Sequence, residues 1–338
     1  MEILYSCDIE TSRQDGYPLY RIPGIVCTNK GTLIVYYECR CAPYIYGSHL
    51  NSDLSVIDVG MKISYDKGKT WTERKIIASS KGRNASNNPV MFVDGDRIHF
   101  IYMENYKRAF YKYSDDEGET WSDATEITDS FDEIREQFPW TTIAVGPGHG
   151  TVLKNGRIIV PVWMASDVTC IYAHTPSVTA TLYSDDHGKT WHMGDVIPTL
   201  GIVNPNESCM AELSDGTVYI SIRHQSPDND RYRCISKSKT GIDNWQRVYL
   251  DKGLQDPICE GGLCSFDKGI LFTNCDSPQG RVNLTLKKST DDGQTWEGFV
   301  YEKNGGYSDV AYDFETGNAF VFYEKDVLDK LVVTAISI

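Results

Sequence analysis

Apolar residues gather along the chain in short runs that turn residues separate. Five of these runs are rich in aromatic and β-branched residues: Arg97–Tyr102, Ala109–Tyr113, Thr217–Ile222, Val282–Lys287 and Ala319–Tyr323. Runs of this length and composition are typical of β-strands. No stretch keeps a helical period of apolar positions for more than a turn or two. The pattern therefore predicts an all-β chain.

An eight-residue pattern, Ser-x-Asp-x-Gly-x-Thr-Trp, occurs four times between such runs. The copies begin at Ser64, Ser114, Ser184 and Ser289. The Asp can accept backbone N–H bonds within its own turn, and the Gly supplies the positive φ that this turn needs. The Trp can lie across the turn and bury its indole. Each copy, here named an Asp box, predicts a corner between two strands.

The spacing of the Asp boxes predicts the architecture. Their starts lie 50, 70 and 105 residues apart, and Ser238–Trp245, which keeps the first and last residues of the pattern, divides the longest interval. Units of about 50 residues with several short strands are typical of β-propeller blades. Five such units, and a last one completed by the N-terminal strand, predict a six-bladed β-propeller. We expect four-stranded antiparallel blades and a single domain over residues 1–338.

The charge balance argues against two classes of partner. The chain has 33 basic and 47 acidic side chains and a net charge of −14, so its long-range field repels nucleic acid and anionic membranes. The sequence has no transmembrane pattern and begins without the basic start and apolar run of a secretory signal. We expect no nucleic-acid or membrane partner, and a location in the cytoplasm, or outside the cell if a signal has been removed.

The ten cysteines are scattered through predicted strands, and their spacing matches no zinc framework. A chain of this size needs no disulfides to build a core. Free thiols are the first expectation, with some structural bridging as the alternative, and no metal is expected.

Three arginines adjoin predicted strands in units that are distant in sequence: Arg21, Arg223 and Arg281. Guanidinium groups that converge from three blades would form a fork-shaped receptor for one carboxylate. Taken one at a time, each arginine could equally form a local ion pair at the surface. The sequence pattern alone leaves both interpretations open.

The segment Tyr20-Arg21-Ile22-Pro23, upstream of repeated Asp boxes, resembles the sialidase (neuraminidase) superfamily, and specifically the bacterial exo-α-sialidases. The resemblance covers the whole chain in order. It implies that Arg21, Arg223 and Arg281 bind the carboxylate of sialic acid and that Glu324 steadies the first of them. It further implies that two segments line the pocket, one containing Arg40 and the other being Gly146–Gly150.

The same resemblance implies three catalytic residues. Asp53, five residues before Asp58, matches the general acid, and Asp58 is the alternative. Tyr307 matches the nucleophile, and Glu207, 16 residues before the second arginine, matches its base, with Glu212 as a rival. Because sialic acid carries a carboxylate on its anomeric carbon, a neutral phenol avoids the repulsion that a carboxylate nucleophile would meet. Two displacements give net retention and require no cofactor.

Two segments depart from the family pattern. The loop from Cys39 to Ser52, which precedes Asp53, carries Pro43, Tyr44, Tyr46 and His49, and Ser86–Pro89 replaces an expected acidic neighbourhood. Trp140, Tyr44 and Tyr46 are candidates for contacts with the leaving group, although structural roles are equally compatible with the pattern.

These features predict an exo-α-sialidase that hydrolyses terminal α-linked sialic acid from sialylated glycans or sialo-oligosaccharides. A trans-sialidase or an anhydro-forming sialidase would use the same residues. A non-catalytic sialoglycan-binding propeller would need only the arginines, and an Asp-box scaffold for protein interactions would need none of them. The sequence does not indicate an oligomeric state.

Overall fold

The computed structural model describes residues 1–41, 53, 55–79, 82, 84–166, 174–227, 231–326 and 328–338. Strands account for almost all of its regular structure, and the 3-10 helix η1 (Thr128–Ile134) is the one helical element in these ranges. The prediction of an all-β chain is therefore confirmed.

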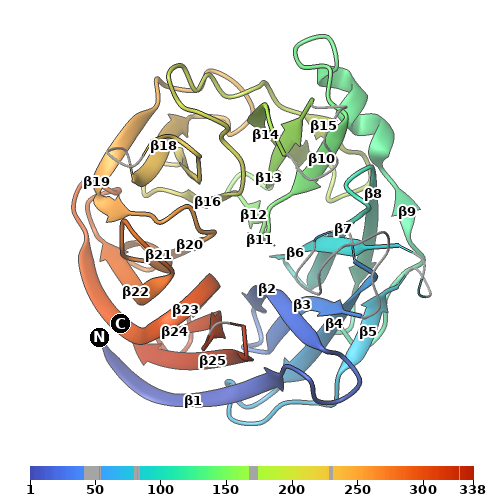
Figure 1. The fold of residues 1–338 in the computed structure, drawn as a ribbon, viewed down its shortest axis with the longest axis vertical. Coiled ribbons are helices and arrows are strands. Elements are labelled where there is room, and N and C mark those ends of the chain that lie inside the picture. Colours follow the sequence, from blue (N-terminus) through green and yellow to red (C-terminus); the bar gives the residue numbers. More distant parts are fainter. Residues whose placement is uncertain are drawn as a thin grey trace.

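The strands form five sheets that are arranged as a ring around a common centre (Figure 1). The first sheet contains β2 (Leu19–Cys27), β3 (Leu33–Arg40), β4 (Ile57–Ser64) and β5 (Lys75–Ala78). The second contains β11 (Gly148–His149), β6 (Ser86–Asp94), β7 (Arg97–Glu104), β8 (Arg108–Ser114) and β9 (Thr125–Glu126). The third contains β10 (Thr142–Val145), β13 (Ile158–Ala165), β14 (Ser177–Ser184) and β15 (His192–Met193), with β12 (Thr151–Val152) also paired to β13. The fourth contains β16 (Ser208–Glu212), β17 (Val218–Ile222), β18 (Tyr232–Ser238) and β19 (Tyr249–Gln255).

The fifth sheet has seven strands, in the order β1 (Glu2–Thr11), β25 (Lys330–Ser337), β24 (Asn318–Lys325), β23 (Glu297–Asp313), β22 (Val282–Ser289), β21 (Gly269–Cys275) and β20 (Gly262–Phe266). Strand β23 is 17 residues long and pairs with β22 along its first part and with β24 along its second part. It therefore joins two four-stranded groups. The predicted pairing of the N-terminal strand with the last unit is confirmed, because β1 pairs with β25.

The expectation of uniform four-stranded blades is wrong for three of the five sheets. The continuous β23 fuses two groups into one sheet, and the short segments β11 and β12 add pairings to the second and third sheets. Strand β11 runs parallel to β6, with Gly148 opposite Val90 and His149 opposite Met91. The chain after β10 thus passes alongside β6 instead of turning directly into the next hairpin.

The Asp boxes form the predicted turns. In the first box, Ser64 Oγ accepts the Gly68 N–H at 2.8 Å, and Asp66 accepts the backbone N–H of Thr70 at 2.9 Å and its hydroxyl at 2.7 Å. The same contacts recur in the other three boxes. The box glycines have φ between +80° and +88°, a range that favours glycine. The fifth, degenerate copy keeps the contact between serine and glycine, at 3.0 Å.

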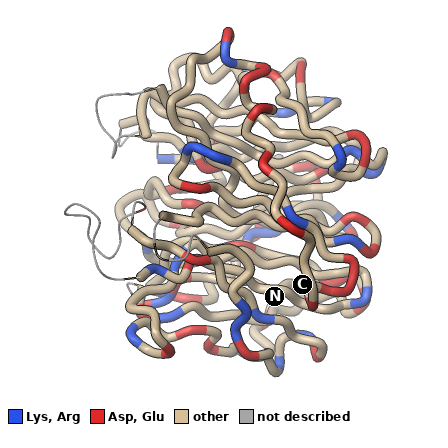
Figure 2. The backbone as a smooth tube through the Cα atoms, turned by 90° about the vertical axis from the view of Figure 1, so that its right-hand side faces the viewer, with Lys and Arg blue, Asp and Glu red and all other residues tan. Residues whose placement is uncertain are grey.

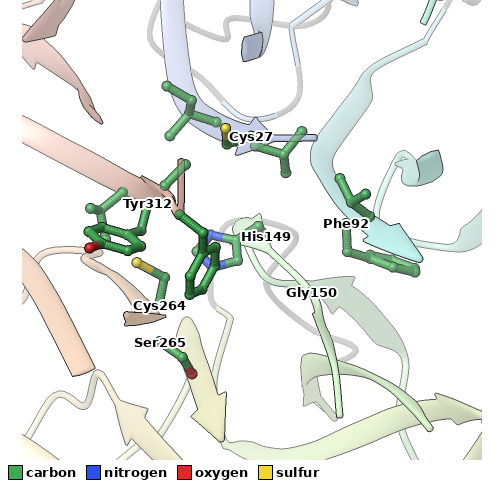
Figure 3. A pocket seen from close by; sticks show the side chains of 13 residues that line it. Cys27, Phe92, His149, Gly150, Cys264, Ser265 and Tyr312 are labelled. Atoms are coloured by element: carbon green, nitrogen blue, oxygen red, sulfur yellow. The ribbon is translucent and has the colours of Figure 1, made fainter. Parts of the chain in front are cut away.

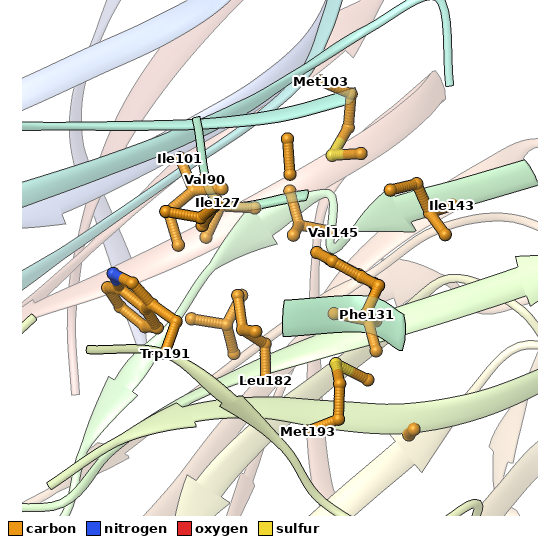
Figure 4. Close-up of a cluster of buried hydrophobic side chains, with 14 of the residues drawn as sticks. Val90, Ile101, Met103, Ile127, Phe131, Ile143, Val145, Leu182, Trp191 and Met193 are labelled. Carbon is orange, nitrogen blue, oxygen red and sulfur yellow. The ribbon is translucent and has the colours of Figure 1, made fainter. Parts of the chain in front are cut away.

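Apolar side chains fill the space between neighbouring sheets. In the largest cluster, side chains of the second and third sheets pack around Phe131 of η1 and the box residue Trp191 (Figure 4). Trp140 belongs to this cluster, is only 8% exposed and donates its indole N–H to the Phe131 carbonyl at 2.9 Å. It is therefore a core residue and not part of a surface that receives a leaving group.

Charged positions of both signs are interspersed along the backbone in Figure 2. No helix of the described residues is long and apolar enough to cross a membrane. Within the same ranges, His, Cys, Asp and Glu side chains form no group of three or more that could hold a metal ion. The nine cysteines that the structure describes are free thiols.

Candidate active site

Tyr307 and Glu207 contact each other although they lie at different sheets of the ring. Tyr307 lies on β23 and is buried, and its hydroxyl lies 2.6 and 2.8 Å from the two carboxylate oxygens of Glu207, which precedes β16. Arg223 forms an ion pair with Glu207 and donates to the Tyr307 hydroxyl at 3.0 Å. A phenol, a carboxylate that can take its proton and a cation therefore share one site.

The ring of Tyr307 also lies against two further arginines. The guanidinium carbon of Arg21 is 4.9 Å from the ring centroid and that of Arg281 is 5.1 Å from it, both within the range of cation–π attraction. Burial raises the pKa of Tyr307, and Arg223, Arg281 and Arg21 only partly oppose this rise. The phenol therefore keeps its proton at neutral pH and needs a base in order to become a nucleophile.

Glu324, on β24, connects Arg21 to the backbone of Tyr307. Its carboxylate accepts from Arg21 Nε at 2.9 Å, from the Ile22 N–H at 3.2 Å and from the Tyr307 N–H at 3.0 Å. Burial alone would raise the pKa of Glu324, but Arg21 and Arg281 hold it below its ordinary value. The carboxylate is thus fully buried, ionised and bonded, and it fixes an arginine and a tyrosine from opposite ends of the chain.

Arg40 and Asp53 lie beside this group. Arg40, at the end of β3, is fully buried and bonds Glu38 at 2.6 Å and Asp53 at 2.8 Å. The side chain of Asp53 is 40% exposed. Burial would raise the pKa of Asp53, but Arg40 and then Arg21 lower it overall. Burial raises the pKa of Glu38, against the opposing charge of Arg40. The free site therefore favours the ionised form of Asp53.

The two alternative carboxylates lie elsewhere. Asp58 pairs with Cys39 across β3 and β4 and accepts from the Tyr17 hydroxyl at 2.9 Å. Since successive side chains of a strand point to opposite faces, Asp58 shares the face of Cys39 and not that of Arg40. Glu212 lies at the far end of β16 from Glu207 and accepts the Lys154 N–H at 2.8 Å.

Three aromatic side chains, Tyr106, Trp163 and His174, form a wall near Asp53 that no sequence motif indicates. The His174 ring lies 4.9 Å from the Tyr106 ring and 4.7 Å from the Trp163 ring, measured between centroids. Burial lowers the pKa of His174, although the charge of Asp53 opposes this. The proposed leaving-group contacts Tyr44 and Tyr46, with Pro43 and His49, lie outside the described residues.

The site combines three arginines with a paired phenol and carboxylate, in a chain whose net charge is −14. The profile of the BNR repeat-like domain matches residues 52–314, well over half of the chain. The chain belongs to this family. Its predicted resemblance to the sialidases is confirmed by relatives of that name. The Bacteroides fragilis sialidase is 26% identical over 320 residues, which cover 83% of this chain and 55% of that protein. Sialidase-2 of Cricetulus griseus is 26% identical over 340 residues, which cover 89% of this chain and 86% of that protein.

The chain thus spans about half the length of its B. fragilis relative. Solved structures share its fold. The Hadza microbial sialidase Hz136 aligns with a TM-score of 0.81 and 23% identity, over 98% of this chain and 68% of its own. The intramolecular trans-sialidase of Ruminococcus gnavus aligns with a TM-score of 0.75 and 16% identity, over 98% of each chain. At these identities the structural alignments establish a β-propeller-like fold.

Proposed function

We propose that this BNR-family chain is a retaining exo-α-sialidase that hydrolyses terminal α-linked sialic acid from sialylated glycans or sialo-oligosaccharides. The observation that carries the proposal is the contact of the Tyr307 hydroxyl with Glu207 among three arginines. The curated relatives named sialidase support the substrate class. A protein that only binds sialoglycans would need the arginines but would have no use for a phenol paired with a base.

In the proposed mechanism, Arg21, Arg223 and Arg281 bind the substrate carboxylate and orient the anomeric carbon over Tyr307. Glu207 accepts the phenolic proton as Tyr307 attacks, and the glycosidic bond breaks as Asp53 protonates the leaving oxygen. Water then attacks the sialyl-tyrosine, Asp53 takes a proton from that water, and the phenol recovers its proton from Glu207. Two inversions at the same carbon give net retention. Each step uses only these side chains, substrate and water.

We further propose that the five sheets form a six-bladed propeller. Four sheets are one blade each, and the seven-stranded sheet provides two blades that share the long strand β23. The inner strands of the blades then surround the site. The proposal also takes residues 1–338 as one catalytic domain, since residues from the first and last sheets contact each other within it.

The test of this function is release of sialic acid from sialyllactose, followed by proton NMR from the first turnover. We expect free sialic acid to appear first as the α-anomer and then to mutarotate. Initial appearance of the β-anomer would exclude a tyrosine intermediate. An anhydro sugar, or transfer to added lactose, would favour the intramolecular or transfer reactions over hydrolysis. Binding without release would leave only a sialoglycan-binding protein.

Asp53→Asn should separate substrates by their leaving groups. With sialyllactose we expect kcat/KM to fall roughly 10²- to 10⁴-fold, the range for loss of general acid catalysis. With an aryl sialoside that has an acidic phenol, kcat/KM should fall much less, because this leaving group departs without a proton.

The wild type should also show a pH dependence. Since Arg40 lowers the pKa of Asp53, wild-type kcat/KM on sialyllactose should rise as the pH falls toward that pKa.

The matched control is Asp58→Asn, five residues away on the other face of the sheet, which should change neither substrate's kcat/KM by more than about threefold. Equal losses on both substrates in Asp53→Asn would show that the residue positions the site and does not donate a proton.

A further inference from the structure

Side-chain carboxyl groups hold the backbone of two successive residues of β23, and the next residue carries a carboxyl group of its own. The Tyr307 N–H donates to Glu324 Oε2 at 3.0 Å, and the Ser308 N–H donates to Glu260 Oε2 at 3.1 Å. Asp309 follows, with its side chain fully buried. A register shift interrupts the pairing of β23 with β24 at this point. The position of the nucleophile therefore depends on these carboxyl groups as well as on the strand ladder.

Asp309 ties the nucleophile strand to other sheets. Its Oδ2 accepts the Ile25 N–H of β2 at 3.0 Å, four residues after Arg21. Its Oδ1 lies 2.8 Å from Nδ1 of His149 on β11. Gly262 of β20 packs directly against it, because a Cβ at that glycine would lie 2.4 Å from Oδ1. One carboxylate thus contacts strands from three of the five sheets.

His149 is held so that its imidazolium form is favoured. It bonds Asp309 and also the Leu263 backbone carbonyl, and only the protonated ring can donate to two acceptors. Burial alone would lower the pKa of His149, but Asp309 and the Leu263 carbonyl raise it. Burial and the charge of Asp309 raise the pKa of Glu260 well above its usual value, so Glu260 remains a neutral acid.

A cavity beside His149 is lined by neither Tyr307 nor Glu207. His149 lines a pocket of about 140 Å³ together with Cys27, Cys264 and Tyr312 (Figure 3). Val310 and Ala311 also line it, directly after Asp309 on β23. The register shift between Gly305 and Ser308 interrupts the alternation of side chains along β23, and Tyr307 packs in the same buried cluster as Val310 and Tyr312.

We propose that His149 and Asp309 form a positioning pair that holds the Tyr307 strand against the Arg21 strand and so keeps the Tyr307 hydroxyl aligned with the anomeric carbon of a substrate bound by the arginines. The pair touches no substrate and acts through the backbone of β23 and β2. This inference rests on the proposed sialidase function. It gives the segment Gly146–Gly150, which we expected from the sequence to line the substrate pocket, a role in positioning the nucleophile strand.

The test compares His149→Ala with His149→Asn, whose amide nitrogen can replace Nδ1 and keep the bond to Asp309. We expect His149→Ala to lose roughly 10- to 100-fold in kcat on an aryl sialoside, because small misplacements of a nucleophile have effects of this size. Its KM should change less than threefold. His149→Asn should recover most of the lost kcat. Ser265→Ala, on the wall of the same pocket, should behave like the wild type.

A role limited to stability would lower the melting temperature and the folded fraction but leave kcat per folded molecule unchanged, and this result would overturn the proposal. Active-site titration with a mechanism-based fluorosialoside counts the competent molecules in each variant. Equal kcat losses in the Ala and Asn variants would also overturn it. If the wild type itself released no sialic acid, the proposed function would fail first, and the two failures would be distinguishable.

Discussion

Tyr307→Phe should abolish turnover while leaving the fold intact. The substitution removes only the hydroxyl that contacts Glu207 and Arg223, and the phenyl ring still fills the space between Arg21 and Arg281. Without the nucleophilic oxygen we expect kcat to fall at least roughly 10³-fold, as for other residues that form covalent intermediates. The free energy of unfolding should change by no more than about 1 kcal/mol. Stopped assays with an aryl sialoside and chemical denaturation measure the two effects.

Tyr312→Phe is a matched control on the same strand. Its hydroxyl donates to Asp267 at 2.9 Å, beyond the central ion pair, so its removal should leave kcat within about twofold of the wild type. Retention of more than a tenth of wild-type activity by Tyr307→Phe would contradict a covalent role for this tyrosine. Binding of a sialic acid analogue by calorimetry should remain in Tyr307→Phe, since all three arginines are present.

Glu324→Ala should have the largest effect on stability. The change leaves the buried Arg21 without its carboxylate and removes the acceptor of the Ile22 and Tyr307 N–H groups. Loss of one partner of a buried, bonded ion pair costs about 3–5 kcal/mol, and we expect a decrease of this size in the free energy of unfolding. KM should rise at the same time, because Arg21 is no longer aimed at the substrate carboxylate. Urea denaturation at pH 7 measures the first effect.

The pH dependence of the free energy of unfolding provides a second test of the role of Glu324. Because the folded-state pKa of Glu324 is lowered, its contribution to stability is present at neutral pH and is lost as the pH falls through that lowered pKa. The wild type should therefore lose more stability on acidification than Glu324→Ala does. Asp329→Asn is the control, since Asp329 pairs with Arg13 at an exposed site and should cost no more than about 1 kcal/mol. A similarly small loss in Glu324→Ala would contradict the role given to this carboxylate.

Sequence patterns predicted those parts of the fold that local chemistry determines. The Asp-box turns depend on residues within an eight-residue window, so each copy could be interpreted by itself. The resemblance to sialidases then selected residues that the structure brings together, with Arg21 and Glu324 in contact across 303 positions. Neither step required knowledge of how the sheets pair.

The other features of the fold and the site depend on contacts between distant segments, which no sequence pattern indicates. Strand β23 continues through Gly305-Gly306, and Gly306 is required there because a Cβ at this position would lie 2.3 Å from Glu324 Oε2. His149 and Asp309 meet across 160 positions. The wall of Tyr106, Trp163 and His174 likewise forms only when distant segments pack.

The pairing of β1 with β25 has a consequence for biosynthesis. The last sheet takes one strand from residues 2–11 and its neighbour from residues 330–337, and the two chain ends lie close together in Figure 1. The proposed catalytic centre combines Arg21, near the start of this sequence, with Glu324, near its end. A chain still emerging from the ribosome can fold its middle sheets, but it cannot assemble this centre until the strands β24 and β25 have emerged. A nascent chain that has not yet exposed these two strands should therefore have no activity.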